Sequence, residues 1–120
     1  ILNIDSKDPN LETRDRFILS KGHAGAALYA ALAESGFFPT TKLSTHYQDG
    51  SDLSGHVSHK NVPGVELSTG SLGHGLSVGV GMAKTAQLDN KKHRIFVICE
   101  MSGCPILFSD FFIFCIIGKI

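Results

Sequence analysis

The chain has 120 residues, of which 42% are apolar and 18% charged, a composition that permits a buried core and argues against disorder. Acidic and basic residues balance at 11 each, which removes the electrostatic basis for binding nucleic acid or an anionic membrane. The three cysteines match no zinc-binding spacing, so we expect reduced thiols in a cytoplasmic protein. The apolar segment 106–118 contains Asp110 and is too short to span a bilayer, so we expect no membrane partner.

The first half of the chain predicts an extended segment followed by helices. Residues 17–19 form a short apolar run, which is typical of a buried strand or extended segment. Residues 24–34 are nearly all apolar with high helix propensity, so we expect a helix that is buried on most sides. Gly36 provides a C-terminal stop for this helix. Residues 40–46 predict a short helix capped by a threonine.

The second half predicts a long loop, a helix and a strand. Residues 48–66 show no periodicity, and such a loop in a compact domain is typically functional or disordered. We expect a helix from residue 72 or 73 to about 88. One of its faces permits close approach by another helix or a subunit, because it carries the small residues Gly75, Gly79, Ala83 and Ala86. Residues 94–99 form the clearest strand, apolar at every residue after Arg94, as in a strand buried on both faces of a parallel sheet. The helix–strand succession predicts an α/β fold.

A glycine-rich turn, G-S-L-G-H-G at residues 70–75, opens the second long helix. Glycine lets a backbone approach a ligand closely, and the free N–H groups at a helix start can hold anions or polar ring atoms. The pattern is neither a dinucleotide-binding fingerprint nor a P-loop. Taken alone, the turn is better explained as a tight turn that helps the helix pack than as a ligand cradle. Glu66 precedes the turn and could accept a proton, although a solvated surface carboxylate is the simpler interpretation.

Several histidines are candidates for binding or catalysis. His23 follows a glycine directly before the first helix, where an imidazole and a helix N-terminus could both meet a phosphate, or where it could simply pack. His46, His56 and His59 lie in or beside the long loop, but their spacing matches no zinc pattern, and solvated loop histidines are the simpler account. His74, flanked by glycines, could reach a ligand or fill a turn.

The order of these motifs is more specific than any one of them. The chain reads R-D-R-F-I-L-S-K-G-H-A at residues 14–24, S-G-H at 54–56 and P-G-V-E-L-S-T-G-S-L-G-H-G-L-S at 63–77. This succession resembles the transketolase family, and within it the N-terminal, thiamine-diphosphate-binding portion. It is most similar to the short N-terminal subunit of split bacterial and archaeal transketolases. The resemblance covers residues 1–99, and we expect a truncated and incomplete thiamine-diphosphate-binding fold.

The resemblance implies an enzyme that transfers a two-carbon ketol unit between ketose and aldose phosphates of the pentose phosphate pathway. It implies thiamine diphosphate held by Mg²⁺ or Ca²⁺, and either a homodimer or pairing with a C-terminal transketolase subunit. By motif, His23 would contact the cofactor diphosphate, and His56 would face the substrate hydroxyls as a catalytic and substrate-binding residue. Gly70, Ser71 and Leu72 would contact the aminopyrimidine. His74 stands where the family more often has glutamine.

The chain departs from the family after residue 99. The family continues with Gly-Asp-Gly and a later asparagine, which supply oxygen ligands to the metal, whereas no Gly-Asp-Gly occurs here. We therefore assign no metal ligands. Residues 100–120 form an apolar segment that resembles nothing in the family, and we interpret it as the product of a frameshift, a retained intron or a faulty gene model.

Three functions remain open at this point. The first is a transketolase fragment that is inactive alone. The second is a non-catalytic remnant that dimerises with or regulates an intact transketolase. The third is a small phosphate-binding module that uses the glycine turn without a metal.

Overall fold

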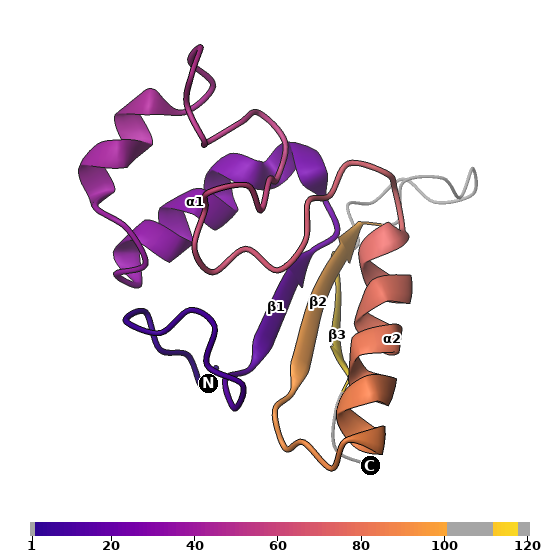
Figure 1. Cartoon of the computed structure of the whole chain (residues 1–120). Coiled ribbons are helices and arrows are strands. Elements are labelled where there is room, and N and C mark those ends of the chain that lie inside the picture. Colours follow the sequence, from indigo (N-terminus) through magenta and orange to yellow (C-terminus); the bar gives the residue numbers. More distant parts are fainter. Residues whose placement is uncertain (1, 101–111, 118–120) are drawn as a thin grey trace.

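The computed structural model describes the backbone of residues 2–100 and 112–117, and side-chain burial for residues 2–99. The described elements, in chain order, are β1 (Arg16–Leu19), η1 (Gly22–Ala24), α1 (Gly25–Glu34), η2 (Thr40–Thr45), α2 (His74–Leu88), β2 (Ile95–Glu100) and β3 (Phe112–Ile117), where η marks a 3-10 helix. Figure 1 shows the strands side by side with α2 beside them. Within the described residues, no helix is long and apolar enough to cross a membrane.

The sheet has the strand order β1-β2-β3. β1 and β2 run parallel, with Arg16 opposite Ile95 and Leu19 opposite Ile98, which confirms the predicted parallel pairing. β3 runs antiparallel to β2, and the sequence did not predict this strand. Of the segment that we expected to be a non-family tail, only Glu100 and residues 112–117 belong to described elements. The origin of that segment stays a prediction.

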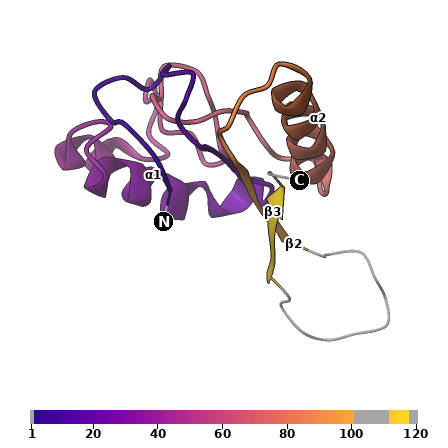
Figure 2. The ribbon, with the colours of Figure 1, turned by 90° about the horizontal axis from the view of Figure 1, so that it is seen from below.

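The sheet is covered on both sides, as the fully apolar strand predicted. Figure 2 shows α1 and α2 on opposite sides of the strands. Ile95 and Val97 are fully buried and pack with Ile18 in a cluster that α2 covers. Leu19 and the partly buried Ile98 belong instead to the cluster around α1. Side chains of a strand point alternately to the two faces, so one strand serves both cores.

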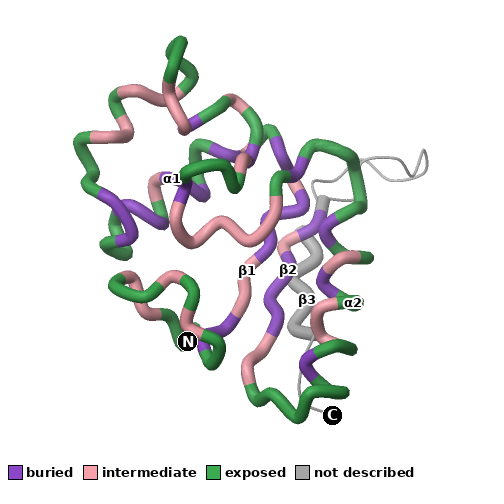
Figure 3. The backbone as a smooth tube through the Cα atoms, viewed as in Figure 1, coloured by how far each residue is buried: buried purple, intermediate pink, exposed green. Residues whose placement is uncertain are grey.

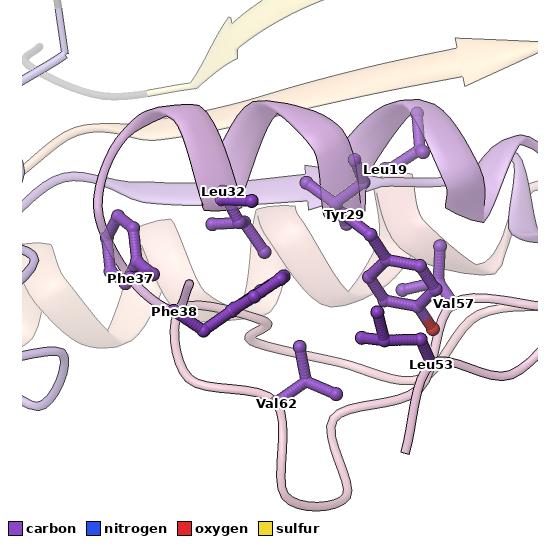
Figure 4. Packing of buried hydrophobic residues seen from close by; sticks show 10 residues of the cluster. Leu19, Tyr29, Leu32, Phe37, Phe38, Leu53, Val57 and Val62 are labelled. Atoms are coloured by element: carbon purple, nitrogen blue, oxygen red, sulfur yellow. The ribbon is translucent and has the colours of Figure 1, made fainter. Parts of the chain in front are cut away.

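The α1 cluster is the larger core (Figure 4). Its buried members are Leu19, Leu28, Tyr29, Leu32, Ala33, Phe37, Phe38, Leu53, Val57 and Val62. A buried aliphatic or aromatic side chain contributes roughly 1.5–3 kcal/mol relative to an exposed one. Leu53, Val57 and Val62 come from the long loop, so the loop itself completes the core.

The first helix differs from the prediction in burial and in its start. A short 3-10 turn, η1, precedes α1, which begins at Gly25. Ala26, Ala27 and Ala31 are exposed. Figure 3 shows both buried and exposed stretches along the helix, so the prediction of burial on most sides was wrong. The helix packs through one face, against the sheet and the long loop. Its predicted stop is confirmed, since Gly36 has φ +84° and the Phe37 N–H donates to the Leu32 carbonyl at 3.0 Å.

The middle of the chain matches its prediction with one exception. A short helix is present at Thr40–Thr45, but its N-cap is Pro39 and no side chain caps it, so the predicted threonine cap was wrong. The segment between η2 and α2 contains neither helix nor strand, as expected. Backbone hydrogen bonds and buried side chains nevertheless hold this loop in place.

Candidate functional site

The carboxyl ends of the two parallel strands form the candidate site. β1 ends at Leu19 and leads through η1 into α1, while α2 begins beside the same end of the sheet. In open α/β sheets, ligands bind in the crevice outside the carboxyl ends of the strands. Two helix starts at this edge also present backbone N–H groups that favour anions.

Three segments that are far apart in the sequence meet at Gly22. A Cβ atom on Gly22 would lie 2.8 Å from the Gly70 Cα and from the Thr69 carbonyl carbon, so only glycine permits this approach. The Val57 N–H donates to the Gly22 carbonyl at 3.0 Å, and the Thr69 N–H donates to the Val57 carbonyl at 3.1 Å. The backbones beside His23, beside His56 and at the glycine turn are therefore joined directly.

The predicted cofactor and catalytic residues all lie at the surface of this site. His23 is exposed in η1, and His56 is exposed in the long loop. Gly70 and Ser71 are exposed, and Leu72 retains 56% of its accessible surface. The His56 ring lies beside the turn, because a Cβ on Gly70 would be 3.5 Å from the His56 Cδ2. The structure thus brings the predicted residues together, while their individual roles stay predictions.

The start of α2 is open toward solvent. Gly73 is the N-cap residue with φ +77°, and a Cβ placed there would meet nothing within 4 Å. His74, the first residue of the helix, is exposed. Open space in front of a helix N-terminus, next to the exposed His56, fits the anionic and polar parts of thiamine diphosphate. The described residues named at this opening include no carboxylate, the oxygen ligand that a hard divalent cation prefers.

The remaining loop histidines do not join this group. His46 is half-buried and packs between the Tyr29 and Tyr47 rings, with centroids at 5.9 and 6.3 Å, so the solvated interpretation was wrong for it. The His59 Nδ1 lies 2.7 Å from the Ser68 hydroxyl. Across the part of the chain that the structure describes, no three His, Cys, Asp or Glu side chains are grouped as they would be around a metal ion.

Glu66 is not the solvated carboxylate that the sequence suggested. Only 10% of its side-chain surface is exposed, and its Oε1 lies 2.5 Å from the Arg14 Nη1. Its Oε2 lies 3.7 Å from the Arg16 Nη1. These groups, with His59, line a polar cavity of about 620 Å³ that includes none of the predicted cofactor residues. Glu66 therefore holds the loop to the start of β1.

The sequence also missed three buried hydroxyl groups around the site. Thr69 donates through Oγ1 to the Leu19 carbonyl, Ser20 accepts from the Gly75 N–H, and Tyr29 bridges two groups of the long loop. Thr69 and Ser20 belong to recognised motifs, and Tyr29 is the one hydroxyl-bearing residue of α1, whose other residues are apolar except for Glu34 at its end. That isolation within α1 is the signal that could have identified Tyr29.

Residues 19–23, 54–57 and 69–75 gather at the carboxyl edge of a parallel strand pair, an arrangement that fits an α/β domain of the thiamine-diphosphate-binding class. The family model "Transketolase, thiamine diphosphate binding domain" matches residues 1–118. The chain therefore belongs to the transketolase family. This confirms the resemblance inferred from the motifs.

Related proteins and structures agree with this assignment. The chain is 44% identical over 98 residues to the 6-deoxy-6-sulfo-D-fructose transketolase subunit SqwG of Clostridium sp., covering 82% of this chain and 36% of that protein. It is 45% identical over 98 residues to an apulose-4-phosphate transketolase subunit of Actinobacillus succinogenes, with the same coverage. The structure of the Leishmania mexicana transketolase superposes with a TM-score of 0.74 at 35% identity, covering 89% of this chain and 18% of that one. The chain thus spans about a third of the curated subunits it matches.

Proposed function

We propose that this chain forms the N-terminal, cofactor-binding part of a transketolase that transfers a two-carbon ketol unit between a ketose phosphate and an aldose phosphate in the pentose phosphate pathway. The observation that carries the proposal is the junction at Gly22, which places the His23, His56 and Gly70 segments side by side at the carboxyl edge of the sheet. When bound, thiamine diphosphate supplies the carbanion chemistry of such a transfer.

Each predicted residue has a role in this proposal. His23 donates a hydrogen bond to the cofactor diphosphate beside the start of α1. Gly70 and Ser71 contact the aminopyrimidine through backbone groups, and the exposed Leu72 side chain packs on its ring. His56 faces the substrate hydroxyls as the catalytic and substrate-binding histidine. Its position against Gly70 supports a role next to the cofactor.

We further propose that this chain alone is inactive. Mg²⁺ or Ca²⁺ requires several oxygen ligands, and the sequence after β2 lacks the family's Gly-Asp-Gly. Residues 1–99 carry the family motifs. Although the family model extends to residue 118, we propose that the apolar residues 100–120 are foreign to the family, because they lack its Gly-Asp-Gly. Without a metal to neutralise it, the diphosphate depends on His23 and on helix N-termini for stabilisation, so binding is weak.

The exposed face of α2 supports pairing with another chain, either a second copy or a C-terminal transketolase subunit. Leu76 and Val80, four residues apart in α2, keep 39% and 51% of their surfaces exposed. Leu72, in the predicted cofactor turn just before the helix, keeps 56%, so a partner that covers these side chains would also cover the site. Two of the similar proteins are themselves named as subunits. We place the assembly in the cytoplasm, in keeping with an odd number of cysteines whose spacing matches no zinc motif.

Calorimetric titration of the full chain with thiamine diphosphate, with and without Mg²⁺, tests the proposal. We expect weak binding that Mg²⁺ does not strengthen, and a loss of affinity of about tenfold in His23→Ala, because a hydrogen bond to a charged group is worth roughly 1.5–3 kcal/mol. His59→Ala is the matched control, since His59 is equally exposed but lies outside the site.

The other outcomes separate the alternatives. Tight, Mg²⁺-dependent binding would indicate that the chain supplies metal ligands of its own and is competent as an enzyme. Weak binding that His23→Ala leaves unchanged would favour a phosphate-binding module that uses only the glycine turn. No binding under either condition would overturn the proposal in favour of a non-catalytic remnant that associates with an intact transketolase.

A further inference from the structure

Three hydroxyl-bearing side chains lie buried beneath the candidate site without touching its open surface. Ser20 keeps 2%, Thr69 7% and Tyr29 none of its accessible surface. Burying a hydroxyl is unfavourable unless it is hydrogen-bonded, so each of these groups needs a partner. All three find a backbone partner in a segment that borders the site.

Ser20 and Thr69 fix the two ends of the glycine turn on the end of β1. The Thr69 Oγ1 donates to the Leu19 carbonyl at 2.8 Å, just before the turn. The Gly75 N–H, just after the turn, donates to the Ser20 Oγ at 3.0 Å. Between these two hydrogen bonds the turn is rich in glycine, which leaves its backbone with few restraints of its own. These two hydrogen bonds, which we call the tethers, therefore fix the position of the turn relative to η1.

Tyr29 fixes the loop that carries His56. Its hydroxyl donates to the His56 carbonyl at 2.8 Å and accepts from the Ser58 N–H at 2.9 Å. The ring itself is held inside the larger core, beside Leu53 and Val57 (Figure 4). Tyr29 in α1 therefore hydrogen-bonds to the backbone on both sides of Val57, and the Val57 N–H donates to the Gly22 carbonyl.

We propose that Ser20, Thr69 and Tyr29 are positioning residues that hold the glycine turn and the His56 loop in their binding geometry before the cofactor arrives. This inference rests on the proposed function. A loop that is already ordered loses less conformational entropy on binding, so the tethers raise affinity without contacting the ligand. Removing a hydroxyl takes a partner from the Leu19 carbonyl, the Gly75 N–H or the Ser58 N–H, which loosens the segment that carries that group; the His56 carbonyl still accepts from the Ser54 hydroxyl.

The test compares three variants with three matched controls in the full chain. Thr69→Val, Ser20→Ala and Tyr29→Phe each remove one hydroxyl and little volume. The controls remove exposed hydroxyls elsewhere, and they are Thr85→Val in α2, Ser44→Ala in η2 and Tyr47→Phe in the loop. Amide hydrogen exchange and thiamine diphosphate affinity are measured for every protein.

We expect two separate local effects. In Ser20→Ala and Thr69→Val, exchange rises about tenfold at residues 69–75, while in Tyr29→Phe it rises about tenfold at Val57 and Ser58. Exchange in β2 stays as in the wild type. All three variants lose about tenfold in cofactor affinity, and the controls change neither quantity.

Each remaining outcome overturns the inference in a recognisable way. Exchange that rises equally in β2 and in the loops would show only a loss of global stability. Local loosening with unchanged affinity would show that the tethers do not set the site. Failure of the wild type to bind thiamine diphosphate would refute the proposed function and, with it, the positioning role. The exchange pattern would still report whether the hydroxyls order the loops.

Discussion

The two ends of the parallel strand pair are held together by different chemistry. At the amino end, charged side chains dominate. The Asp15 Oδ2 lies 2.6 Å from the Arg94 Nη2, which joins the residue before β1 to the residue before β2. Glu66 joins Arg14 on the same side of the sheet. These ion pairs connect segments 79 and 52 residues apart in sequence, respectively, so they stabilise the fold as a whole.

At the carboxyl end, neutral groups join the segments instead. Backbone N–H and carbonyl groups, glycines and hydroxyls make the contacts around Gly22, Thr69 and Gly75. The histidines there, His23, His56 and His74, are exposed. The comparison indicates that ion pairs secure the strands at the amino end, whereas hydroxyl and backbone groups fix the turn and the loop at the carboxyl end, where helix N-termini favour an anionic ligand. The predictions below separate the two ends by whether a change acts on the whole fold or on the site.

The largest effect is expected for Glu66→Gln at the amino end. It would leave the buried Arg14 without its opposite charge, and breaking a buried pair by removing one partner costs roughly 3–5 kcal/mol. Urea unfolding measures the loss. Glu12→Gln is the control, because Glu12 pairs with Lys91 at the exposed surface and its loss should hardly move the urea midpoint. Equal shifts in the two variants would contradict the role given to Glu66.

A smaller, local effect is expected for Gly75→Ala at the carboxyl end. An added Cβ would lie 2.5 Å from the Ser20 Cβ and 3.0 Å from the Ile18 Cγ2, so α2 must shift away from β1 at a cost of roughly 1–3 kcal/mol. Gly81→Ala in the same helix meets nothing within 4 Å and should instead stabilise the protein by about 0.5–1 kcal/mol, since alanine favours helix.

Thermal unfolding measures both glycine variants, and hydrogen exchange locates the change. We expect Gly75→Ala to loosen residues 70–74 more than β2, whereas Glu66→Gln should raise exchange throughout the sheet. If Gly75→Ala lowered the stability no more than Gly81→Ala does, the small residues on that face of α2 would not be needed for its close approach to β1. The small-residue face of α2 was predicted to contact a helix or a subunit. At Gly75 it contacts the end of β1 instead, where the neighbours are Ile18 and Ser20.

Periodicity and turn chemistry predicted most of the fold because they are local properties. The apolar run at residues 94–99 identified β2 and its two buried faces, and Gly36 identified the end of α1. Burial of α1 was overestimated because alanine is small and apolar on every face, so the exposed Ala27 carries no polar marker. β3 could not be predicted as a strand of this sheet, since its pairing with β2 is a tertiary contact.

The order of the motifs identified the candidate site, but the sequence did not identify the residues that hold its segments in place. His23, His56 and the glycine turn were chosen by resemblance, and the structure places them together. Glu66 was misread because no local pattern reveals that an arginine 52 residues earlier will meet it. Tyr29 was overlooked for the same reason, since its partners are 27 and 29 residues away.

The smallest effect concerns Asp15 and acid. Burial alone would raise the pKa of Asp15, but hydrogen bonds from the Arg94 side chain and from the backbone N–H groups of Asn3 and Arg94 outweigh it and hold the pKa below its ordinary value of 3.8. A carboxylate whose pKa is lowered on folding stabilises the protein above its unfolded pKa, and this contribution is lost as the pH falls below 3.8 through the folded pKa.

We therefore expect Asp15→Asn to lower stability by about 1–2 kcal/mol at pH 7, with the difference from wild type shrinking as the pH falls below about 4. Urea unfolding between pH 3 and pH 7 measures this, and Glu34→Gln, at the end of α1, is the control. Because Asp15 lies at the amino end, cofactor affinity at pH 7 should be unchanged in the folded variant. An affinity loss as large as that of His23→Ala would mean that the two ends of the strands are coupled, and the division drawn between them would be wrong.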